Sequence, residues 1–275
     1  MAQQRHVTIA DQRAVTPRMR WLTLAAPELA RSVRAGQYLL VRCAEDGSYD
    51  PLLRRPLFVA AAEPALGQVG LLYAPSERGL AWLARGRPGD TLDIIGPLGH
   101  PFAIAARTRN LLLIGQGPGL AALLLLARTA AARDCAVTLL VGAGADDDLP
   151  PPFLLPAAVE YQSVVGPAIS LLGERKTENS KLKTQNSKLS SPLHPIAWAD
   201  QVFAALPDDQ ITRLYETIHA VKYRWERGFA SVLREGPIVC GVGACGVCAV
   251  ALRRGSRLLC SDGPVFDLRD VVGNG

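Results

Sequence analysis

Short apolar runs, interrupted by Pro, Gly and Asp, dominate the first hundred residues of the chain. Runs of this length and spacing are typical of short β-strands that follow one another closely. Strands are expected at residues 6–10, 18–25, 37–42, 57–61, 70–74 and 89–95, with one helix at residues 77–85. Many short strands with a single helix predict a small antiparallel β-barrel, which we expect to occupy residues 1–104.

The apolar pattern changes after Asn110, where strands begin to alternate with helices. We expect strands at residues 111–114, 136–141 and 196–205 and helices at residues 120–132 and 211–221. Alternation of this kind predicts βαβ units and therefore a parallel sheet. This α/β domain is expected to span residues 105–222, so the fold class is multidomain, with a β-barrel followed by an α/β domain.

A glycine loop, Gly115-Gln-Gly-Pro-Gly119, lies between the first strand and the first helix of this α/β domain. Pro118 suits the first turn of a helix, where its missing N–H costs nothing. The helix N-terminus and the loop amides form an anion site suited to a dinucleotide pyrophosphate, with Gly115, Gly117 and Gly119 as the binding residues. The spacing is G-x-G-x-G rather than G-x-G-x-x-G, so a plain turn between strand and helix stays open as the alternative.

The composition breaks at residues 174–195, inside the expected α/β domain. Four lysines gather there in a chain that otherwise uses arginine, and only Lys222 lies elsewhere. Thr177-Glu-Asn-Ser-Lys-Leu-Lys183 is nearly repeated as Thr184-Gln-Asn-Ser-Lys-Leu-Ser190. Such a polar, repetitive segment cannot bury enough apolar surface to order itself. We interpret it as a low-complexity insertion in a surface loop, with a docking segment as the alternative.

Four cysteines near the C-terminus follow the spacing C-x4-C-x2-C-x11-C: Cys240, Cys245, Cys248 and Cys260. Four thiolates can ligate the two irons of a [2Fe–2S] cluster, and C-x4-C-x2-C with a distant fourth cysteine is the plant-type spacing. Structural zinc is an alternative, although zinc sites usually consist of two short cysteine pairs separated by a longer spacer. Disulfides or inert thiols are the other alternative. The pattern favours the iron–sulfur cluster.

Three glycines, Gly241, Gly243 and Gly246, alternate with these cysteines. A loop that wraps a cluster needs tight turns and positive φ so that backbone amides can point at sulfur, and glycine permits both. Beyond the loop, residues 247–252 and 257–260 are expected to form a hairpin that turns near Gly255 and brings Cys260 back to the other cysteines. We expect a small cluster domain over residues 223–275.

Overall composition narrows the function further. Hydrophobic residues make up 49% of the 275 residues and charged residues 20%, which describes a globular protein with a substantial core. The formal charge of +5 is mild and the arginines are scattered, so nucleic-acid binding is not indicated. The N-terminus has no apolar signal core, and the longest apolar run, near residues 120–127, is too short to span a bilayer. We therefore expect a cytoplasmic protein without a membrane segment, in which Cys43 and Cys135 are buried free thiols.

Four stretches together resemble one known family. They are Leu53-Arg-Arg-Pro-Leu57, Gly96-Pro-Leu-Gly-His-Pro-Phe102, the glycine loop, and residues 240–266 with their tail Asp262-Gly-Pro-Val-Phe266. The chain resembles the ferredoxin–NADP reductase superfamily, and most closely the electron-transfer subunits of NAD-dependent, two-subunit dihydroorotate dehydrogenases. The cluster stretch is the most specific of the four and the glycine loop the least. Together they span most of the chain.

The resemblance implies that the barrel binds FAD, that the α/β domain binds NAD(H), and that the C-terminal domain holds the [2Fe–2S] cluster. The flavin-binding residues that it implies are Arg55, Pro56, Leu57, Phe58, Leu72, Tyr73, Ala74, Gly79 and Leu80. Core packing for Tyr73 and a surface salt bridge for Arg55 are the alternatives. Two positions depart from the family, since Phe58 and Leu80 stand where hydroxyl residues are usual. Each change removes a hydrogen bond to the flavin worth about 0.5–1.5 kcal/mol.

The resemblance also implies a redox partner, namely an FMN-containing dihydroorotate dehydrogenase catalytic subunit in a hetero-oligomer. That subunit oxidises dihydroorotate to orotate in pyrimidine biosynthesis, with NAD+ as the final acceptor. No His/Asp/Ser constellation in this chain suggests another substrate, so we expect cofactor ligands and no acid–base catalytic residues. A reductase for an oxygenase or hydrogenase partner, or a non-enzymatic iron–sulfur carrier that lacks flavin or NADH binding, stays open.

Three consecutive aspartates, Asp146 to Asp148, follow the second strand of the βαβ unit. A carboxylate near this position of a dinucleotide fold can accept hydrogen bonds from ribose hydroxyls, whereas a 2′-phosphate requires arginine. The aspartates therefore predict NADH rather than NADPH as the nicotinamide. A solvated turn before Pro150 is the alternative.

Overall fold

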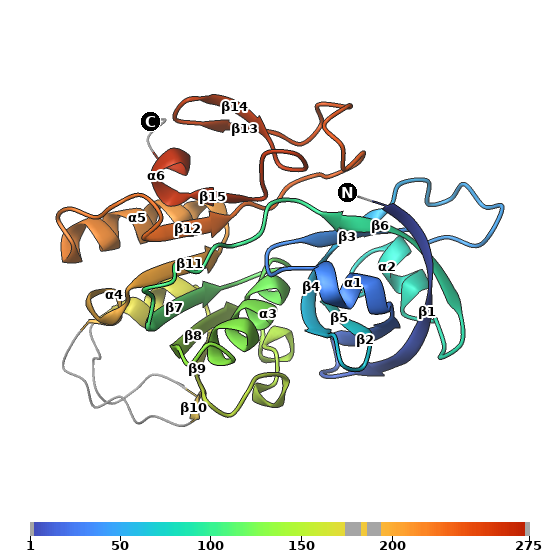
Figure 1. Cartoon of the computed structure of the whole chain (residues 1–275), viewed down its shortest axis with the longest axis horizontal. Helices are drawn as coiled ribbons and strands as arrows, with labels where there is room; N and C mark the ends of the chain where they lie inside the picture. The colour runs from blue at the N-terminus through green and yellow to red at the C-terminus, as the bar shows by residue number, and fades with distance from the viewer. Residues whose placement is uncertain (1–2, 174–182, 186–193, 273–275) are drawn as a thin grey trace.

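A closed, six-stranded antiparallel barrel forms the first part of the structure (Figure 1). The computed structural model describes residues 3–173, 183–185 and 194–272. The barrel strands are β1 (Gln3–Ala14), β2 (Arg20–Ala25), β3 (Tyr38–Val41), β4 (Arg55–Glu63), β5 (Gln68–Tyr73) and β6 (Thr91–Leu98), in the order β1-β2-β5-β4-β3-β6. The predicted barrel is confirmed. Leucines such as Leu22, Leu24 and Leu39 fill it with no exposed surface.

Two short helices accompany the barrel. The expected helix is present as α2 (Arg78–Leu83), whereas α1 (Pro27–Ser32) was not predicted. The apolar side chains of α1, Leu29 and Ala30, are buried against the barrel. With only six residues, this helix has too few turns to show a helical period in the sequence.

The second part is a seven-stranded sheet in the order β10-β9-β8-β7-β11-β12-β15. Its parallel strands are β7 (Asn110–Gly115), β8 (Ala136–Ala143), β9 (Val159–Val165), β11 (Gln201–Ala205) and β12 (Ala230–Leu233). The antiparallel edges are β10 (Lys183–Gln185) and β15 (Val265–Asp267). Residues 111–114 are completely buried, as expected for a parallel strand that is covered on both faces. The predicted parallel sheet is confirmed.

Helices cover this sheet on both faces. α3 (Leu120–Ala131) lies between the sheet and the barrel, where it packs against β4 as well as against β7 and β8 (Figure 1). α5 (Asp208–Val221) presents Ile211, Leu214 and Ile218 to a second core on the other face. Three 3-10 turns, η1 (Asp146–Asp148), η2 (Pro152–Leu154) and η3 (Ala168–Leu172), follow the carboxyl ends of β8 and β9.

The single strand expected at residues 196–205 is wrong in its first half. Residues there form the short helix α4 (Pro195–Trp198), and only β11 is a strand. Asp200 lies between α4 and β11, and its carboxylate accepts the amides of Arg109 and Asn110, each at 2.9 Å. These bonds fix the chain beside β7 at the point where β11 begins. The insertion expected at residues 174–195 lies mostly outside the described residues, and β10 is the strand seen within it.

The C-terminal segment, expected as a small domain over residues 223–275, shares two strands with the sheet of the α/β domain. β12 and β15 belong to the large sheet, while the cysteine loop and a two-stranded hairpin lie between them in the sequence. The hairpin strands are β13 (Ala249–Leu252) and β14 (Gly255–Leu258), so the hairpin turns near Gly255, as expected, with the turn at Arg253 and Arg254. A final helix, α6 (Leu268–Val271), follows β15. Within the described part of the chain, no helix is both long and apolar enough to cross a membrane.

Gly142, near the end of β8, permits a close backbone contact that shapes the carboxyl edge of the sheet. A Cβ at this position would lie 2.3 Å from the Ala168 nitrogen and 2.5 Å from the Gly166 oxygen. Gly142→Ala should therefore lower the free energy of unfolding by about 1–3 kcal/mol, the usual cost of overpacking. Gly144→Ala is the matched control, since a Cβ there meets nothing within 4 Å. Urea unfolding would measure both, and equal midpoints would contradict the expectation.

Candidate redox-cofactor site

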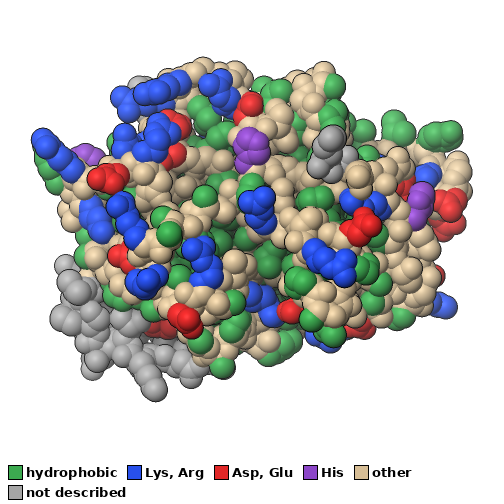
Figure 2. All heavy atoms as spheres, viewed as in Figure 1, with side chains coloured by type: hydrophobic (Ala, Val, Ile, Leu, Met, Phe, Trp, Pro, Cys, Tyr) green, Lys and Arg blue, Asp and Glu red, His purple; other side chains and the backbone are tan. Residues whose placement is uncertain are grey.

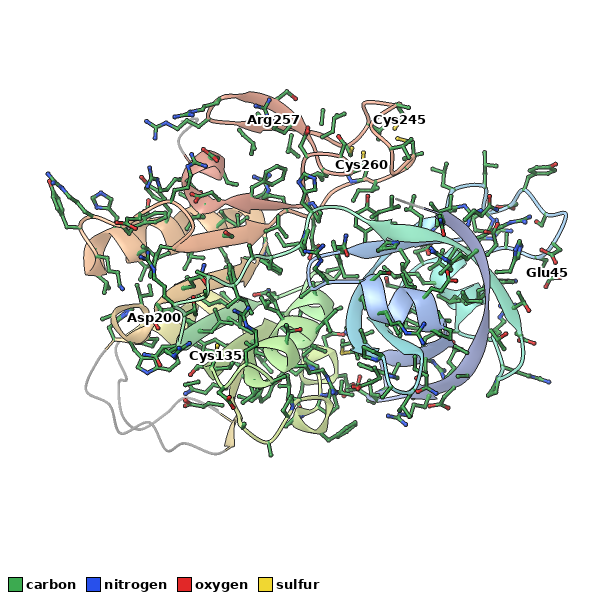
Figure 3. All side chains as sticks on the ribbon, viewed as in Figure 1. Glu45, Cys135, Asp200, Cys245, Arg257 and Cys260 are labelled. Carbon is green, nitrogen blue, oxygen red and sulfur yellow. The ribbon has the colours of Figure 1, made fainter. Side chains whose placement is uncertain are left out.

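The four cysteines of the C-terminal loop come together as two pairs. The Cys248 and Cys260 sulfurs lie 3.3 Å apart, and the Cys245 side chain is close enough to Cys240 to help lower the pKa of the Cys240 thiol. The first pair is buried, whereas Cys245 is exposed and Cys240 is half-buried. Figure 3 shows Cys245 and Cys260 on neighbouring turns of the loop. Each iron of a [2Fe–2S] cluster takes two thiolates, so a two-pair arrangement matches that cluster.

Backbone amides point at these sulfurs. The amides of Val242 and Cys245 lower the pKa of Cys240 to about 6, which favours the thiolate that binds metal. The Gly243 amide lies 3.2 Å from the Cys260 sulfur, but burial is the larger effect there and raises its pKa to about 11. As an iron ligand, Cys260 would have to lose this proton.

The positive φ angles expected in this loop are confirmed. Gly241, Gly243 and Gly246 have φ of +72°, +77° and +70°, a conformation that L side chains rarely adopt. The loop amides can turn toward sulfur because of these angles. Among the described residues, three or more His, Cys, Asp or Glu side chains do not converge on one point as they would around a single metal ion.

The cysteine loop rests on one edge of the barrel. A Cβ on Gly241 would lie 2.8 Å from a Leu40 methyl and 2.9 Å from a Leu98 methyl, so β3 and β6 form the floor under the loop. The His100 amide donates to the Gly263 oxygen at 2.6 Å just beyond β6. The buried pair, Cys248 and Cys260, belongs to the same hydrophobic core as the barrel. The cluster loop and the barrel are therefore one packed unit.

The structure brings the proposed flavin residues together on adjacent barrel strands. Residues 55–58 open β4, residues 72–73 close β5, and Ala74 follows directly. The two strands pair at Val59 and Leu71. Leu57, Phe58, Leu72 and Tyr73 are buried in the barrel core, so core packing accounts for part of what these residues do.

Arg55 reaches α2 through a glutamate that sequence reasoning missed. The Glu77 carboxylate binds the Arg55 guanidinium at 2.7 and 3.0 Å and accepts the amides of Gly79 at 3.0 Å and Leu80 at 2.6 Å. The Arg55 bond, with help from those amides, lowers the pKa of Glu77 to about 2. A carboxylate thus occupies donors of Arg55, Gly79 and Leu80, three residues that the family resemblance assigns to flavin binding, which shows that these donors fit an anion such as the flavin phosphate. Glutamate is not a common N-cap, so the sequence carried no local signal for it.

The glycine loop is held by two side chains. Gln116 accepts the Ala168 amide at 3.1 Å and the Gln210 side-chain amide at 2.8 Å, which ties the loop to η3 and α5. The Glu235 carboxylate accepts the Gly119 amide at 2.6 Å, at the N-terminus of α3. Glu235 keeps access to solvent, yet protein atoms surround it densely enough that burial raises its pKa. It lies just before the cysteine loop and was also missed.

The three aspartates form η1 at the carboxyl end of β8, close to the barrel. Arg18 pairs with Asp148 at 3.3 Å, and the Thr16 hydroxyl donates to the Asp147 carbonyl at 2.5 Å. NADH was predicted from the aspartates alone. Arg18 of the barrel adds a positive charge beside them, although the turn keeps a net negative charge.

Comparisons with known proteins agree with this arrangement. Residues 235–272 match the family model described as the iron–sulfur cluster binding domain of dihydroorotate dehydrogenase B. Relatives named "Dihydroorotate dehydrogenase B (NAD(+)), electron transfer subunit" include one from Geobacillus kaustophilus, 30% identical over 99% of this chain and 100% of the relative. Another, from Geobacillus thermodenitrificans, is 29% identical over 99% of this chain and 100% of its own length.

Solved structures share the fold. A structure described as an NADH-dependent reduced ferredoxin–NADP oxidoreductase matches with a TM-score of 0.72 and 22% identity, covering 96% of this chain and 89% of that one. A ferredoxin reductase in carbazole 1,9a-dioxygenase matches with a TM-score of 0.62 and 18% identity, covering 84% and 69%. Because a relative that is 30% identical matches over its full length, the chain belongs to the family of the electron-transfer subunits of dihydroorotate dehydrogenase B (NAD+).

Proposed function

We propose that this chain carries electrons between the FMN of a dihydroorotate dehydrogenase catalytic subunit and NAD, through a [2Fe–2S] cluster and FAD. It works in the cytoplasm as part of a hetero-oligomer. The observation that carries the proposal is the arrangement of the four thiols as two pairs on the barrel edge formed by β3 and β6, where β3 is the neighbour of β4. When bound, the flavin exchanges a hydride with nicotinamide and single electrons with the cluster, which links two-electron and one-electron chemistry.

The residues of the chain supply binding and electrostatics rather than acid–base catalysis. The four thiolates hold iron, and the loop amides stabilise negative charge on sulfur. FAD binding requires positive charge for the phosphates and an apolar wall for the flavin ring. Arg55 offers the positive charge, and strands β4 and β5 form the wall. The glycine loop offers amides at the N-terminus of α3 for the nicotinamide dinucleotide. The oxidation of dihydroorotate therefore belongs to the partner.

The surface around the cluster suits a protein partner. Val242 and Val247 in the cysteine loop are 64% and 51% exposed, beside the exposed Cys245. The neighbouring hairpin carries Arg253, Arg254 and Arg257, and Figure 2 shows basic side chains gathered over that end of the molecule. Apolar contacts next to the cluster with basic residues around them provide affinity and orientation for an acidic face.

Reconstitution tests this function directly. The chain, copurified with the dihydroorotate dehydrogenase catalytic subunit of the same genome, should show flavin and cluster absorption bands and should reduce NAD+ when dihydroorotate is added. Cys260→Ser should lose iron and acid-labile sulfide and reduce NAD+ at background rate, because an iron with an open position is labile. Cys135→Ser is the matched control, since its buried thiol lies at the Thr108 carbonyl, far along the chain from the loop. Cluster bands without flavin bands would instead indicate a simple electron carrier.

The nicotinamide preference follows from the charge at η1. At contact distance and an effective dielectric near 20, one like-charge pair costs on the order of 4 kcal/mol before salt screening. Arg18 offsets only part of this repulsion of a 2′-phosphate. NADH should therefore reduce the bound flavin about tenfold faster than NADPH at equal concentration, measured by stopped-flow absorbance. Equal rates would show that the adenosine lies elsewhere and that the aspartates form only a solvated turn.

Glu77 should compete with the flavin phosphate for Arg55 and the two α2 amides. Because the pKa of Glu77 is about 2, its carboxylate stays ionised near pH 7, and protonation of Glu77 does not relieve the competition there. Glu77→Gln should bind FAD about tenfold more tightly, or about 1.4 kcal/mol, as measured by quenching of flavin fluorescence on apoprotein. Asp50→Asn removes the same charge from a carboxylate that pairs with Arg78 and should change little. Weaker binding by Glu77→Gln would make Glu77 a supporting residue instead.

A further inference from the structure

Tyr38, the first residue of β3, carries a buried hydroxyl without a partner. Its side chain is completely buried, and its oxygen is one of three buried side-chain N or O atoms that lack a hydrogen bond in the described part of the chain. The other two belong to Arg128 and Arg234, whose guanidinium groups bond through another nitrogen. Tyr38 has no second polar atom. A phenylalanine would fill the same space without burying an unpaired hydroxyl.

The surroundings of Tyr38 indicate what the hydroxyl is placed to meet. On one side its ring contacts Phe58 of β4 edge to face, with centroids 6.0 Å apart. On the other side lies the cysteine segment: Tyr38 shares one buried core with Cys248 and Cys260, and a Cβ on Gly99 would meet both the Tyr38 ring and Pro264. Burial, together with the charges of these cysteines, raises the pKa of Tyr38. Figures 1 and 3 show the cysteine loop over the edge of the barrel formed by β3 and β6.

The loop cannot move far from this tyrosine. Tyr38 pairs with Leu98 across β3 and β6, and the neighbouring Leu40 and Leu98 side chains support Gly241. A Cβ on Gly99, directly after β6, would lie 3.0 Å from the Tyr38 ring and 2.6 Å from Pro264, at the far end of the cysteine segment. Tyr38 therefore lies between the barrel strands and the segment that carries the cysteines, and its own side chain has no surface exposed to water.

We propose that the Tyr38 hydroxyl donates a hydrogen bond to a sulfur atom of the [2Fe–2S] cluster or of its cysteine ligands, and that this bond raises the reduction potential of the cluster. The inference rests on the cluster of the proposed function. A bound cluster would accept one electron, supplied by reduced flavin or by the partner, and this would make its sulfur atoms more negative. A buried donor stabilises that added charge strongly, because the surroundings have a low dielectric. The hydroxyl proton stays on Tyr38, so no proton is transferred.

Tyr38→Phe in the cluster-loaded chain tests the proposal. The variant should keep its iron and sulfide, but its cluster should be harder to reduce by about tenfold in the equilibrium constant, which is about 59 mV for a one-electron couple. A redox titration followed by electron paramagnetic resonance of the reduced cluster gives this value and also reports a change in the g-values. Tyr161→Phe is the matched control, since that buried hydroxyl donates to the Pro150 carbonyl at 2.9 Å in the α/β domain. Its potential should equal that of the wild type.

A second measurement separates a hydrogen bond to the cluster from a structural role of the Tyr38 hydroxyl. In cluster-free protein, Tyr38→Phe should unfold at the same temperature as the wild type or higher, because no protein partner is lost. A lower unfolding temperature would show that the hydroxyl has a protein partner and would overturn the proposal, as would an unchanged potential and g-values. A wild-type chain that holds no [2Fe–2S] cluster would overturn the proposed function as well, so the two failures are distinguishable.

Discussion

The packing of the cysteine loop against the edge of the barrel is the contact on which the rest of the arrangement depends. The loop has little core of its own, since most residues of β13 and β14 are exposed. Its ends are fixed because β12 enters it and β15 leaves it as paired neighbours, with Leu233 opposite Val265. Loop closure is therefore achieved by the sheet, and the barrel provides the floor. Without these two supports, four thiols would have to be ordered against a large entropy cost.

Two glutamates satisfy hydrogen-bond donors of this fold from within the protein. Buried amides and a guanidinium at the ends of strands are costly when they lack partners. Glu77 accepts hydrogen bonds from the Arg55 guanidinium and from the first amides of α2. Glu235 accepts the Gly119 amide at the N-terminus of α3. Their carboxylates keep the donors in position. If these donors bind phosphate as proposed, the same charges would oppose it, so preorganisation and competition would come from the same side chains.

Local patterns predicted most of the fold, because strands, glycine turns and cysteine spacing are written in neighbouring residues. The barrel, the βαβ unit and the positive φ of Gly241 follow from such patterns. Pairings between distant residues could not be predicted. Arg18 meets Asp148 across 130 positions, and Glu235 meets Gly119 across 116. The short strands β12 and β15 become strands because the sheet offers an edge, so their sequences alone carry little signal.

The environments of the two thiol pairs differ in a way that suits directional electron transfer. Cys248 and Cys260 face the barrel core, where β4 and Tyr38 lie, whereas Cys245 is at the surface between exposed valines. A carrier between an internal flavin and an external partner needs one end of its cluster close to each. Burial on the inner side excludes water and strengthens every hydrogen bond to sulfur, while exposure on the outer side permits contact with another protein. The asymmetry follows from a loop laid flat on a barrel, because only one of its faces can be covered.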